Sequence, residues 1–393
     1  MIEELARACV HCGFCLPTCP TYVLWSEEMD SPRGRIQLME KTAQGTLRLS
    51  PTVVEHFDRC LGCMACVSSC PSGVRYDLLI EETRALVEDE HPRPRGERLQ
   101  RRLLFATLPH PRRLSGALRL APVGRRLPTP RWARSMLELA PAWRSGERPP
   151  AVTPAAGTTV ATVGLLTGCV QSVLFGDVNT ATARVLAAAG YEVLAPAQGC
   201  CGALSQHAGR ARESARFTER LGSRFDGVES IVVNSSGCGS HLKERGLPAV
   251  DVTEALSGTA LPGLHPLELT IAYQDSCHLR HAQRLPAAWT PLLEGIPGLR
   301  VVEPAEQDLC CGSAGIYNVT QPDAARALGD RKARNVLATA PDAYASANPG
   351  CLVQLSQALG RARAALPALH PVELLDASLR GIPAAELLDG ARR

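Results

Sequence analysis

Two runs of cysteines near the N-terminus have the residue type and spacing of metal ligands. The chain holds 16 cysteines in 393 residues, and the two runs account for eight of them. In each run three cysteines stand three residues apart, a fourth follows four residues later, and a proline comes directly after it. The first run is Cys9, Cys12, Cys15, Cys19 and Pro20, and the second is Cys60, Cys63, Cys66, Cys70 and Pro71. Thiolates at this spacing bind zinc or iron–sulfur clusters, so the runs predict metal chemistry.

This spacing is that of the run that binds cubane 4Fe–4S clusters in bacterial ferredoxins. In proteins with two such clusters, the fourth cysteine of a run ligates the other cluster. We therefore expect one 4Fe–4S cluster on Cys9, Cys12, Cys15 and Cys70, and a second on Cys60, Cys63, Cys66 and Cys19. Zinc is the alternative, because cysteine pairs separated by two residues also bind zinc. Two complete copies, each with its proline, favour iron–sulfur clusters.

The other eight cysteines form an internal repeat. Each copy has one cysteine after a predicted strand, then a Cys-Cys-Gly sequence, then a Gly-Cys pair. The first copy is Cys169, Cys200, Cys201 and Cys238, and the second is Cys277, Cys310, Cys311 and Cys351. Two interpretations stay open: the four thiolates of a repeat bind a further iron–sulfur cluster or zinc, or the thiols pack as small buried apolar groups.

Histidines and arginines near the cysteines allow two interpretations each. His207, His278 and His281 are candidate ligands or proton shuttles, but packing or capping is favoured, since the cysteines suffice as ligands. Arg33 and Arg35 either set the charge near a cluster, which tunes its potential, or form a solvated pair.

Helix signals between and after the two runs indicate how the cysteines are positioned. Ser31-Pro32 and Ser50-Pro51 are helix starts, with serine as the cap and proline in the first turn. Asp77 is expected to cap a third helix. Helices between the runs are typical of an α-helical ferredoxin rather than one built of β-hairpins, so residues 1–90 are predicted to form an α-helical ferredoxin domain.

Residues 91–159 have a different composition. Fourteen arginines lie between Arg93 and Arg148, against three glutamates, and prolines recur throughout. This composition predicts a linker with short helices. It either docks on an acidic partner or on anionic lipid, or it is a flexible tether.

The rest of the chain alternates between strand and helix signals. Short apolar runs predict strands at 160–166, 230–234 and 269–274, and helical spacing marks 180–189 and 324–337. This alternation is typical of α/β structure. Together with the repeat it predicts a pseudo-symmetric pair of α/β units, residues 160–265 and 266–393, in a chain that is α+β overall.

Composition and absent motifs exclude several functions. The net charge of +3 gives no reason to expect nucleic acid. The N-terminus lacks the features of a secretory signal, which favours a cytoplasmic protein. The sequence has no Gly-x-Gly-x-x-Gly, P-loop or Gly-x-Ser-x-Gly motif. A chain without a flavin or nicotinamide site transfers electrons but leaves the oxidation of a substrate to a partner.

The repeat resembles the cysteine-rich CCG domain of the heterodisulfide reductase catalytic subunit and of several respiratory iron–sulfur subunits. The fullest form of that domain ends in Cys-x-x-Cys, whereas Ser235 and Asn348 stand here in place of its first cysteine. This difference disfavours both a non-cubane cluster and disulfide reduction by the repeats. A scaffold whose repeats hold zinc is another alternative.

Further motifs resemble the glycolate oxidase iron–sulfur subunit over nearly the whole chain. They are CVHCGFCLPTCPTY (9–22), SPRGRI (31–36), DRCLGCMACVSSCPSGVRY (58–76), GCCGALSQHAG (199–209), LCCGSAGIYN (309–318) and ANPGC (347–351). The resemblance implies a complex in which flavoprotein subunits oxidise glycolate to glyoxylate. This chain would pass the electrons to an acceptor such as quinone, either in the cytoplasm or on the inner face of the membrane. The alternatives are subunits for lactate utilisation, glycerol-3-phosphate oxidation or heterodisulfide reduction.

Overall fold

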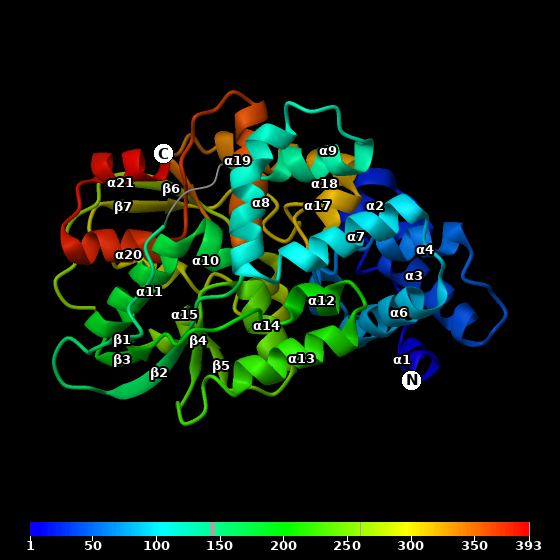
Figure 1. Ribbon diagram of the computed structural model, residues 1–393, viewed down its shortest axis with the longest axis horizontal. Helices are drawn as coiled ribbons and strands as arrows, with labels where there is room; N and C mark the ends of the chain where they lie inside the picture. The colour runs from blue at the N-terminus through cyan, green and yellow to red at the C-terminus, as the bar shows by residue number, and fades with distance from the viewer. Residues whose placement is uncertain (142–145, 260, 393) are drawn as a thin grey trace.

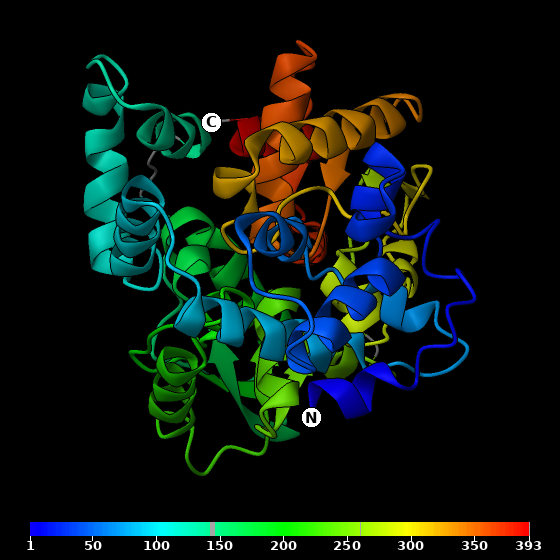
Figure 2. The same ribbon diagram turned by 90° about the vertical axis from the view of Figure 1, so that its right-hand side faces the viewer.

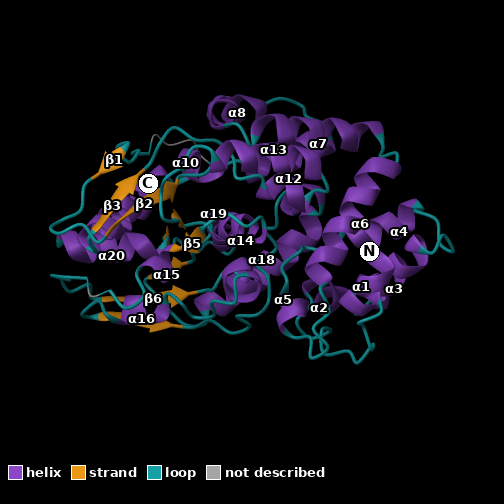
Figure 3. Cartoon of the chain, turned by 90° about the horizontal axis from the view of Figure 1, so that it is seen from below, coloured by secondary structure: helices purple, strands orange, loops and turns teal. Residues whose placement is uncertain are grey.

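The computed structural model describes residues 1–141, 146–259 and 261–392, so residues 142–145 of the predicted linker lie outside the described residues. Helices make up the N-terminal part, and two α/β units follow, which confirms the predicted fold class (Figure 1). Seen from below, the strands gather at one end of the molecule and the N-terminal helices at the other (Figure 3). The proposed domain boundaries at residues 90, 159 and 265 stay a prediction.

The N-terminal part consists of short helices joined by the cysteine loops. They are α1 (Ile2–Ala6), α2 (Pro20–Trp25), η1 (Glu28–Asp30), α3 (Pro32–Ala43), α4 (Pro51–Asp58), α5 (Ala65–Ser68) and α6 (Tyr76–Glu90). The Ser31 hydroxyl accepts from the Gly34 N–H at 3.0 Å, and Ser50 caps α4 in the same way. The expectation for Asp77 was wrong: α6 begins at Tyr76, and Asp77 pairs with Arg75 inside the first turn.

The arginine-rich segment contains three helices, α7 (Arg95–Thr107), α8 (Pro111–Gly124) and α9 (Arg131–Leu139). Figure 2 shows them along one side of the molecule, in cyan and teal. Leu104 and Phe105 of α7 are buried against Ala208 and Ile316, which belong to different α/β units. The interpretation of the arginine-rich segment as a flexible tether is therefore wrong for α7.

The first α/β unit contains a five-stranded sheet in the order β1-β3-β2-β4-β5, parallel except for β1. Its strands are β1 (Val152–Thr153), β2 (Ala161–Leu166), β3 (Tyr191–Leu194), β4 (Ile231–Val233) and β5 (Ala249–Asp251). Its helices are α10 (Val170–Leu174), α11 (Gly176–Ala188), α12 (Ala203–His207), α13 (Ala211–Gly222), α14 (Ser236–Glu244) and α15 (Val252–Ala255).

The second α/β unit contains a four-stranded parallel sheet in the order β7-β6-β8-β9. Its strands are β6 (Leu269–Tyr273), β7 (Leu299–Val302), β8 (Ala343–Ala345) and β9 (Ala368–Leu369). Its helices are η2 (His278–Ala282, a π-helix), α16 (Thr290–Glu294), α17 (Tyr317–Thr320), α18 (Pro322–Leu337), α19 (Pro349–Arg361), α20 (Pro371–Arg380) and α21 (Ala384–Arg392). The order repeats that of β3-β2-β4-β5, so the two units are pseudo-symmetric.

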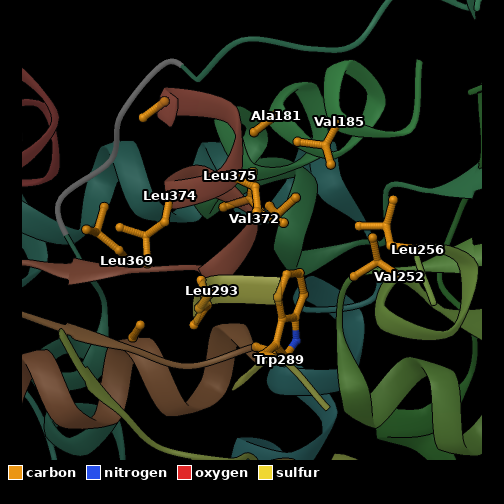
Figure 4. Close-up of a cluster of buried hydrophobic side chains, with 14 of the residues drawn as sticks. Ala181, Val185, Val252, Leu256, Trp289, Leu293, Leu369, Val372, Leu374 and Leu375 are labelled. Carbon is orange, nitrogen blue, oxygen red and sulfur yellow. The ribbon is translucent and has the colours of Figure 1, made fainter. Parts of the chain in front are cut away.

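One hydrophobic core joins the two units. Figure 4 shows side chains from α11, α16, β9 and α20 meeting around Trp289, which is fully buried. At the surface of this contact Arg184 of α11 donates to the Asp376 carboxylate of α20 at 2.7 and 2.6 Å. The units therefore pack as one body. No helix within the described residues is long and apolar enough to cross a membrane.

Candidate metal centres

Each N-terminal cysteine run forms a loop with the same sequence of backbone conformations. His11 and Gly13 in the first loop have φ of 54° and 88°, and Gly62 and Met64 in the second have φ of 63°. These residues lie two and four positions after the first cysteine of each run. Positive φ is uncommon for residues other than glycine, so its recurrence at His11 and Met64 indicates that both loops fold for one purpose.

The eight N-terminal thiols line two cavities. One cavity is lined by Cys9, Cys12, Cys15 and Cys70, and the other by Cys19, Cys60, Cys63 and Cys66. Cys66, Pro32 and Tyr76 line both, so the cavities are adjacent. The structure thus brings the fourth cysteine of each run together with the first three of the other run. We refer to these as the outer and the inner cavity, in that order.

The donor atoms around both cavities suit iron–sulfur ligation. At least four thiols line each cavity, Cys66 being shared between the two, and no carboxylate lines either one. Cysteine thiolates are the ligands that hold 4Fe–4S clusters. Within the described parts of the chain, no three Cys, His, Asp or Glu side chains form a site for a single metal ion. A cubane takes its thiolates on four different irons, so its ligands stand further apart than those of one zinc ion.

The two cavities differ in their exposure to solvent. Cys12 of the outer cavity is exposed, and its neighbours Val10 and Phe14 are 67% and 66% exposed. Cys19 and Cys60 of the inner cavity are buried. The outer cavity therefore lies where a partner protein can approach it, and the inner cavity lies behind it.

Arg35 brings a buried positive charge to the inner cavity. Its side chain is 1% exposed and lines that cavity. Its guanidinium donates to the Asp30 carboxylate at 3.2 Å and approaches the Cys19 Sγ at 3.9 Å. The interpretation as a solvated pair is wrong for Arg35, whereas Arg33 is partly exposed and pairs with Glu28 at the surface.

This charge acts on the Cys60 thiol. Burial alone would raise the pKa of Cys60, but the positive charges of Arg35 and Arg84 lower that pKa below its ordinary value. The Gly62 N–H and the Tyr76 hydroxyl also donate to the Cys60 Sγ, at 3.4 and 3.6 Å. Because the thiolate is the form that ligates a metal, the surroundings of Cys60 favour its role as a ligand.

In the first α/β unit the four repeat cysteines form a chain of thiol contacts. The Cys169 and Cys200 Sγ atoms lie 3.4 Å apart. Hydrogen bonding to the Cys200 and Cys238 thiols, together with burial, raises the pKa of Cys201 well above its ordinary value. Gly202 has φ of 99°, and a Cβ there would lie 2.7 Å from the Ser214 carbonyl oxygen. The Cys-Cys-Gly turn therefore needs its glycine.

The second α/β unit repeats this arrangement. The Sγ atoms of Cys277 and Cys310 lie 4.0 Å apart, and those of Cys311 and Cys351 lie 3.4 Å apart. Hydrogen bonding to Cys277 and then to Cys311 raises the pKa of Cys310 and so joins the two pairs. The structure thus gathers the four cysteines of each repeat.

Comparison with known proteins agrees with this division of the cysteines. Residues 5–74 match the model of the 4Fe-4S dicluster domain, and residues 163–243 and 271–356 match that of the cysteine-rich CCG domain. The chain is 32% identical to the probable glycolate oxidase iron–sulfur subunit of Bacillus subtilis over 97% of this chain and 92% of that protein. It is 34% identical to the glycolate oxidase iron–sulfur subunit of Escherichia coli over 91% of each chain. The chain belongs to the glycolate oxidase iron–sulfur subunit family.

More distant similarities extend beyond this family. The chain is 26% identical to one of the subunits of the dihydromethanophenazine:CoB–CoM heterodisulfide reductase of Methanosarcina barkeri, over 89% of this chain and 88% of that one. A crystal structure of a hypothetical protein from Helicobacter pylori has the same fold, with a TM-score of 0.52 at 10% identity; the match covers 90% of this chain and 69% of that one. As a glycolate oxidase iron–sulfur subunit homologue with a dicluster domain, the chain has two 4Fe–4S clusters as its cofactors.

In this family member the inner cavity adjoins the second repeat. Leu61 and Cys63 pack in one buried cluster with Cys310 and Tyr317, and Cys277 lies against it. Burial, followed by the nearby Cys277 thiol, raises the pKa of Cys63 well above its ordinary value. The dicluster domain therefore lies against the thiols of the second repeat, a contact that the sequence does not indicate.

Of the histidines near the repeat cysteines, His278 lies beside a thiol and His281 packs between domains. His281 packs the domains together, with its ring nitrogens 2.7 Å from the Ser68 Oγ and 3.2 Å from the Asp308 carbonyl oxygen. His278 Nδ1 lies 3.5 Å from the Cys277 Sγ, and the centroid of its ring lies 5.1 Å from that of His207, with the two rings tilted by 54°. His278 is therefore beside a thiol, whereas His281 is a packing residue.

Lys332 is a residue near the second repeat that the sequence reading missed. It is 1% exposed, donates to the Gln274 amide oxygen at 3.0 Å, and burial lowers its pKa to about 8 despite the nearby Cys311 thiol. It follows Leu328 and precedes Val336 by four residues each, on the apolar face of α18. A lysine at this spacing is the signal that could have marked it as buried.

Proposed function

We propose that this chain is the electron-transfer subunit of a complex that oxidises glycolate to glyoxylate. The oxidation releases two electrons and two protons, which a partner flavoprotein accepts. The chain receives the electrons one at a time and passes them to an acceptor outside the complex. Alone it does not oxidise glycolate, because its sequence has no flavin or nicotinamide motif.

The observation that carries this proposal is the pair of adjacent thiol-lined cavities, one exposed and one enclosed. We assign one cluster to Cys9, Cys12, Cys15 and Cys70, and the other to Cys60, Cys63, Cys66 and Cys19. Electrons then enter at the outer cluster, beside the exposed Val10 and Phe14, and move inward. This direction places the flavoprotein against the first cysteine loop and the acceptor near the inner cluster. A quinone acceptor would place the complex on the inner face of the cytoplasmic membrane.

The test is an assay of the chain with and without a partner. The chain is purified with its clusters intact and mixed with glycolate and the dye dichlorophenolindophenol. We expect no dye reduction by the chain alone, and reduction once the flavoprotein subunits of the same organism are added. Glycolate-dependent turnover by the isolated chain would contradict the proposal.

Heterodisulfide reduction is the second candidate, because the Methanosarcina barkeri relative is similar over 89% of this chain. The residues count against it, since Ser235 and Asn348 replace one cysteine in each repeat. Reduction of a heterodisulfide by the chemically reduced chain, without any flavoprotein, would favour this candidate over electron transfer.

A further inference from the structure

A groove rich in arginine lies where the C-terminal end of α6 meets α7 and α13. Its volume is about 610 Å³, and seven arginines line it against three acidic residues. The arginines are Arg93, Arg98, Arg101, Arg102, Arg210, Arg212 and Arg216, and the acids are Glu88, Asp89 and Glu213. Seven positive charges against three negative ones leave the groove at +4, whereas the whole chain carries +3. The positive charge of the chain is therefore concentrated here.

Three of these arginines are paired within the protein. Arg93 and Arg101 approach the Glu88 carboxylate at 3.6 and 3.2 Å. Arg210 pairs with Glu213 at 2.9 Å. These guanidinium groups already have carboxylate partners, so they are not the ones that a ligand would need to neutralise.

The other four arginines are exposed and form no ion pair with any residue that the structure describes. Arg98 and Arg102 stand four residues apart on α7, and Arg212 and Arg216 stand four residues apart on α13. Residues at this spacing are neighbours on a helix surface, and like charges there destabilise the helix slightly. Of the acids that line the groove, Asp89 alone remains to offset them. We refer to these four residues as the exposed arginines.

The helices that carry the exposed arginines are fixed relative to each other. The Arg101 guanidinium of α7 donates to the Ala208 carbonyl oxygen at 3.3 Å, shortly before α13 begins. The Arg210 guanidinium lies 4.4 Å from the centroid of the Phe105 ring of α7, as in a cation–π contact. The groove is thus formed before a partner arrives, which reduces the entropy lost on binding.

Several unpaired guanidinium groups suit a ligand with several carboxylates, because arginine binds carboxylates by paired, charge-assisted hydrogen bonds. None of the described residues that line the groove has an apolar side chain larger than those of Ala85 and Ala211, and none is aromatic. Basic surfaces that bind lipid combine their charges with large apolar side chains, and those that bind single-stranded nucleic acid add aromatic rings. The lining therefore favours an acidic segment of a protein over either alternative.

We propose that this groove docks an acidic segment of the flavoprotein partner, whose carboxylates accept hydrogen bonds from the exposed arginines. The inference rests on the proposed function, which supplies the partner. Helix α6 begins at Tyr76, which lines both cluster cavities, and its last turn lines the groove. A helix of 15 residues is about 22 Å long, so one protein can cover the groove and also reach the cluster domain.

The first experiment measures the binding of the flavoprotein subunits of the same organism to the full chain with both clusters present. Isothermal titration calorimetry at low salt compares the wild type with Arg98→Glu/Arg102→Glu and Arg212→Glu/Arg216→Glu. Each double variant sets carboxylates against those of the partner, so the dissociation constant should rise by at least about tenfold in both. High salt should weaken binding to the wild type and reduce this difference, because it screens exposed charges.

Arg300→Glu/Arg334→Glu is the matched control for net charge. Both arginines are exposed in the second α/β unit and do not line the groove. The control makes the same change in charge, but solvent screens charges remote from an interface, so its affinity should stay within about twofold of the wild type. Equal weakening in the control and the groove variants would overturn the inference.

Two further probes identify the class of ligand with the unaltered protein. An oligoglutamate peptide should compete with the flavoprotein for the wild type, and vesicles of phosphatidylglycerol should not. Absence of competition by the peptide would contradict an acidic segment as the ligand. Vesicle binding that both groove variants lose, with flavoprotein binding unchanged, would assign the groove to the membrane and overturn the inference.

Glycolate-dependent dye reduction separates this inference from the proposed function. Absence of turnover by the wild type with its flavoprotein subunits contradicts the proposed function. Where the wild type turns over, both groove variants should need more flavoprotein for half-maximal rate and reach the same maximal rate, because the exposed arginines hold the partner and carry no electrons. An unchanged dependence on flavoprotein concentration in both variants contradicts only the docking site.

Discussion

The side chains of Ser235 and Asn348 meet between the two α/β units, with 3.5 Å between the serine Oγ and the asparagine Oδ1. These residues occupy the positions at which the fullest form of the repeat has an additional cysteine. The Asn348 amide nitrogen lies 3.6 Å from the Cys351 Sγ. A hydroxyl and an amide thus lie beside the repeat thiols where two thiolates would otherwise stand, which reduces each repeat to four cysteines.

Metal analysis tests what those four cysteines do. Two cubanes account for about eight irons per chain, so iron above eight belongs to the repeats. We predict that the wild type binds metal beyond the two cubanes. Cys311→Ala should lose part of this additional metal, because the Cys311 thiol is in contact with that of Cys351. Cys201→Ala is the matched variant in the first repeat. An unchanged metal content in both variants would leave the repeats with a packing role only.

Replacing Arg35 should make the inner cluster harder to reduce. One unit charge at an assumed distance of about 7 Å and an effective dielectric constant of about 20 contributes at most roughly 2.4 kcal/mol, or about 100 mV, and the Asp30 carboxylate that pairs with Arg35 offsets part of it. We expect the midpoint potential of the inner cluster to fall in Arg35→Met by up to about that amount, as measured by an EPR-monitored redox titration.

Arg33→Met is the control for this prediction. Arg33 lines the outer cavity but is partly exposed and paired with Glu28, so solvent screens its charge. Its replacement should shift either potential by much less. Equal shifts in the two variants would refute a special effect of the buried charge.

A glycine in the first unit approaches the dicluster domain too closely for a side chain. Gly209 has φ of 82°, and a Cβ there would lie 2.2 Å from the Arg84 carbonyl oxygen of α6. Gly227 has φ of 84°, but a Cβ there would meet no atom within 4 Å. Gly209→Ala should therefore destabilise the protein by about 2–5 kcal/mol, and Gly227→Ala by about 1–2 kcal/mol.

Thermal unfolding of the cluster-containing protein compares these two variants. The fall in the apparent melting temperature should be at least about twice as large for Gly209→Ala, because both variants share the backbone strain and only one also displaces a backbone segment. Equal falls would show that α6 and residue 209 are not packed as described.

The local features of the site could be predicted from the sequence. The cysteine spacing predicted an assignment of the eight thiols to two clusters, because ligand geometry restricts the loop between them, and this assignment stays a prediction. Ser31 and Ser50 predicted their helix starts correctly, since capping depends on residues within one turn. The repeat predicted two similar units, because similar sequences fold in the same way.

Contacts between segments distant in the chain could not be predicted from the sequence. An amphipathic pattern shows which face of a helix is buried but not what buries it, so nothing marked Leu104 and Phe105 as partners of Ala208 and Ile316. The same limit hid the contact between His281 and Ser68, which are 213 residues apart. Asp77 was assigned as a cap because Arg75 and Tyr76 gave no signal of their own as the start of α6.

The crossed assignment of the two clusters is the central claim, and serine variants of the cysteines test it most directly. Cys12→Ser and Cys63→Ser serve as references, because each removes a ligand from the middle of one run. The EPR spectrum of the reduced Cys70→Ser protein should lose the same signal as Cys12→Ser, and that of Cys19→Ser the same signal as Cys63→Ser. Loss of the Cys63→Ser signal in Cys70→Ser would show that each run holds its own cluster and would contradict the account.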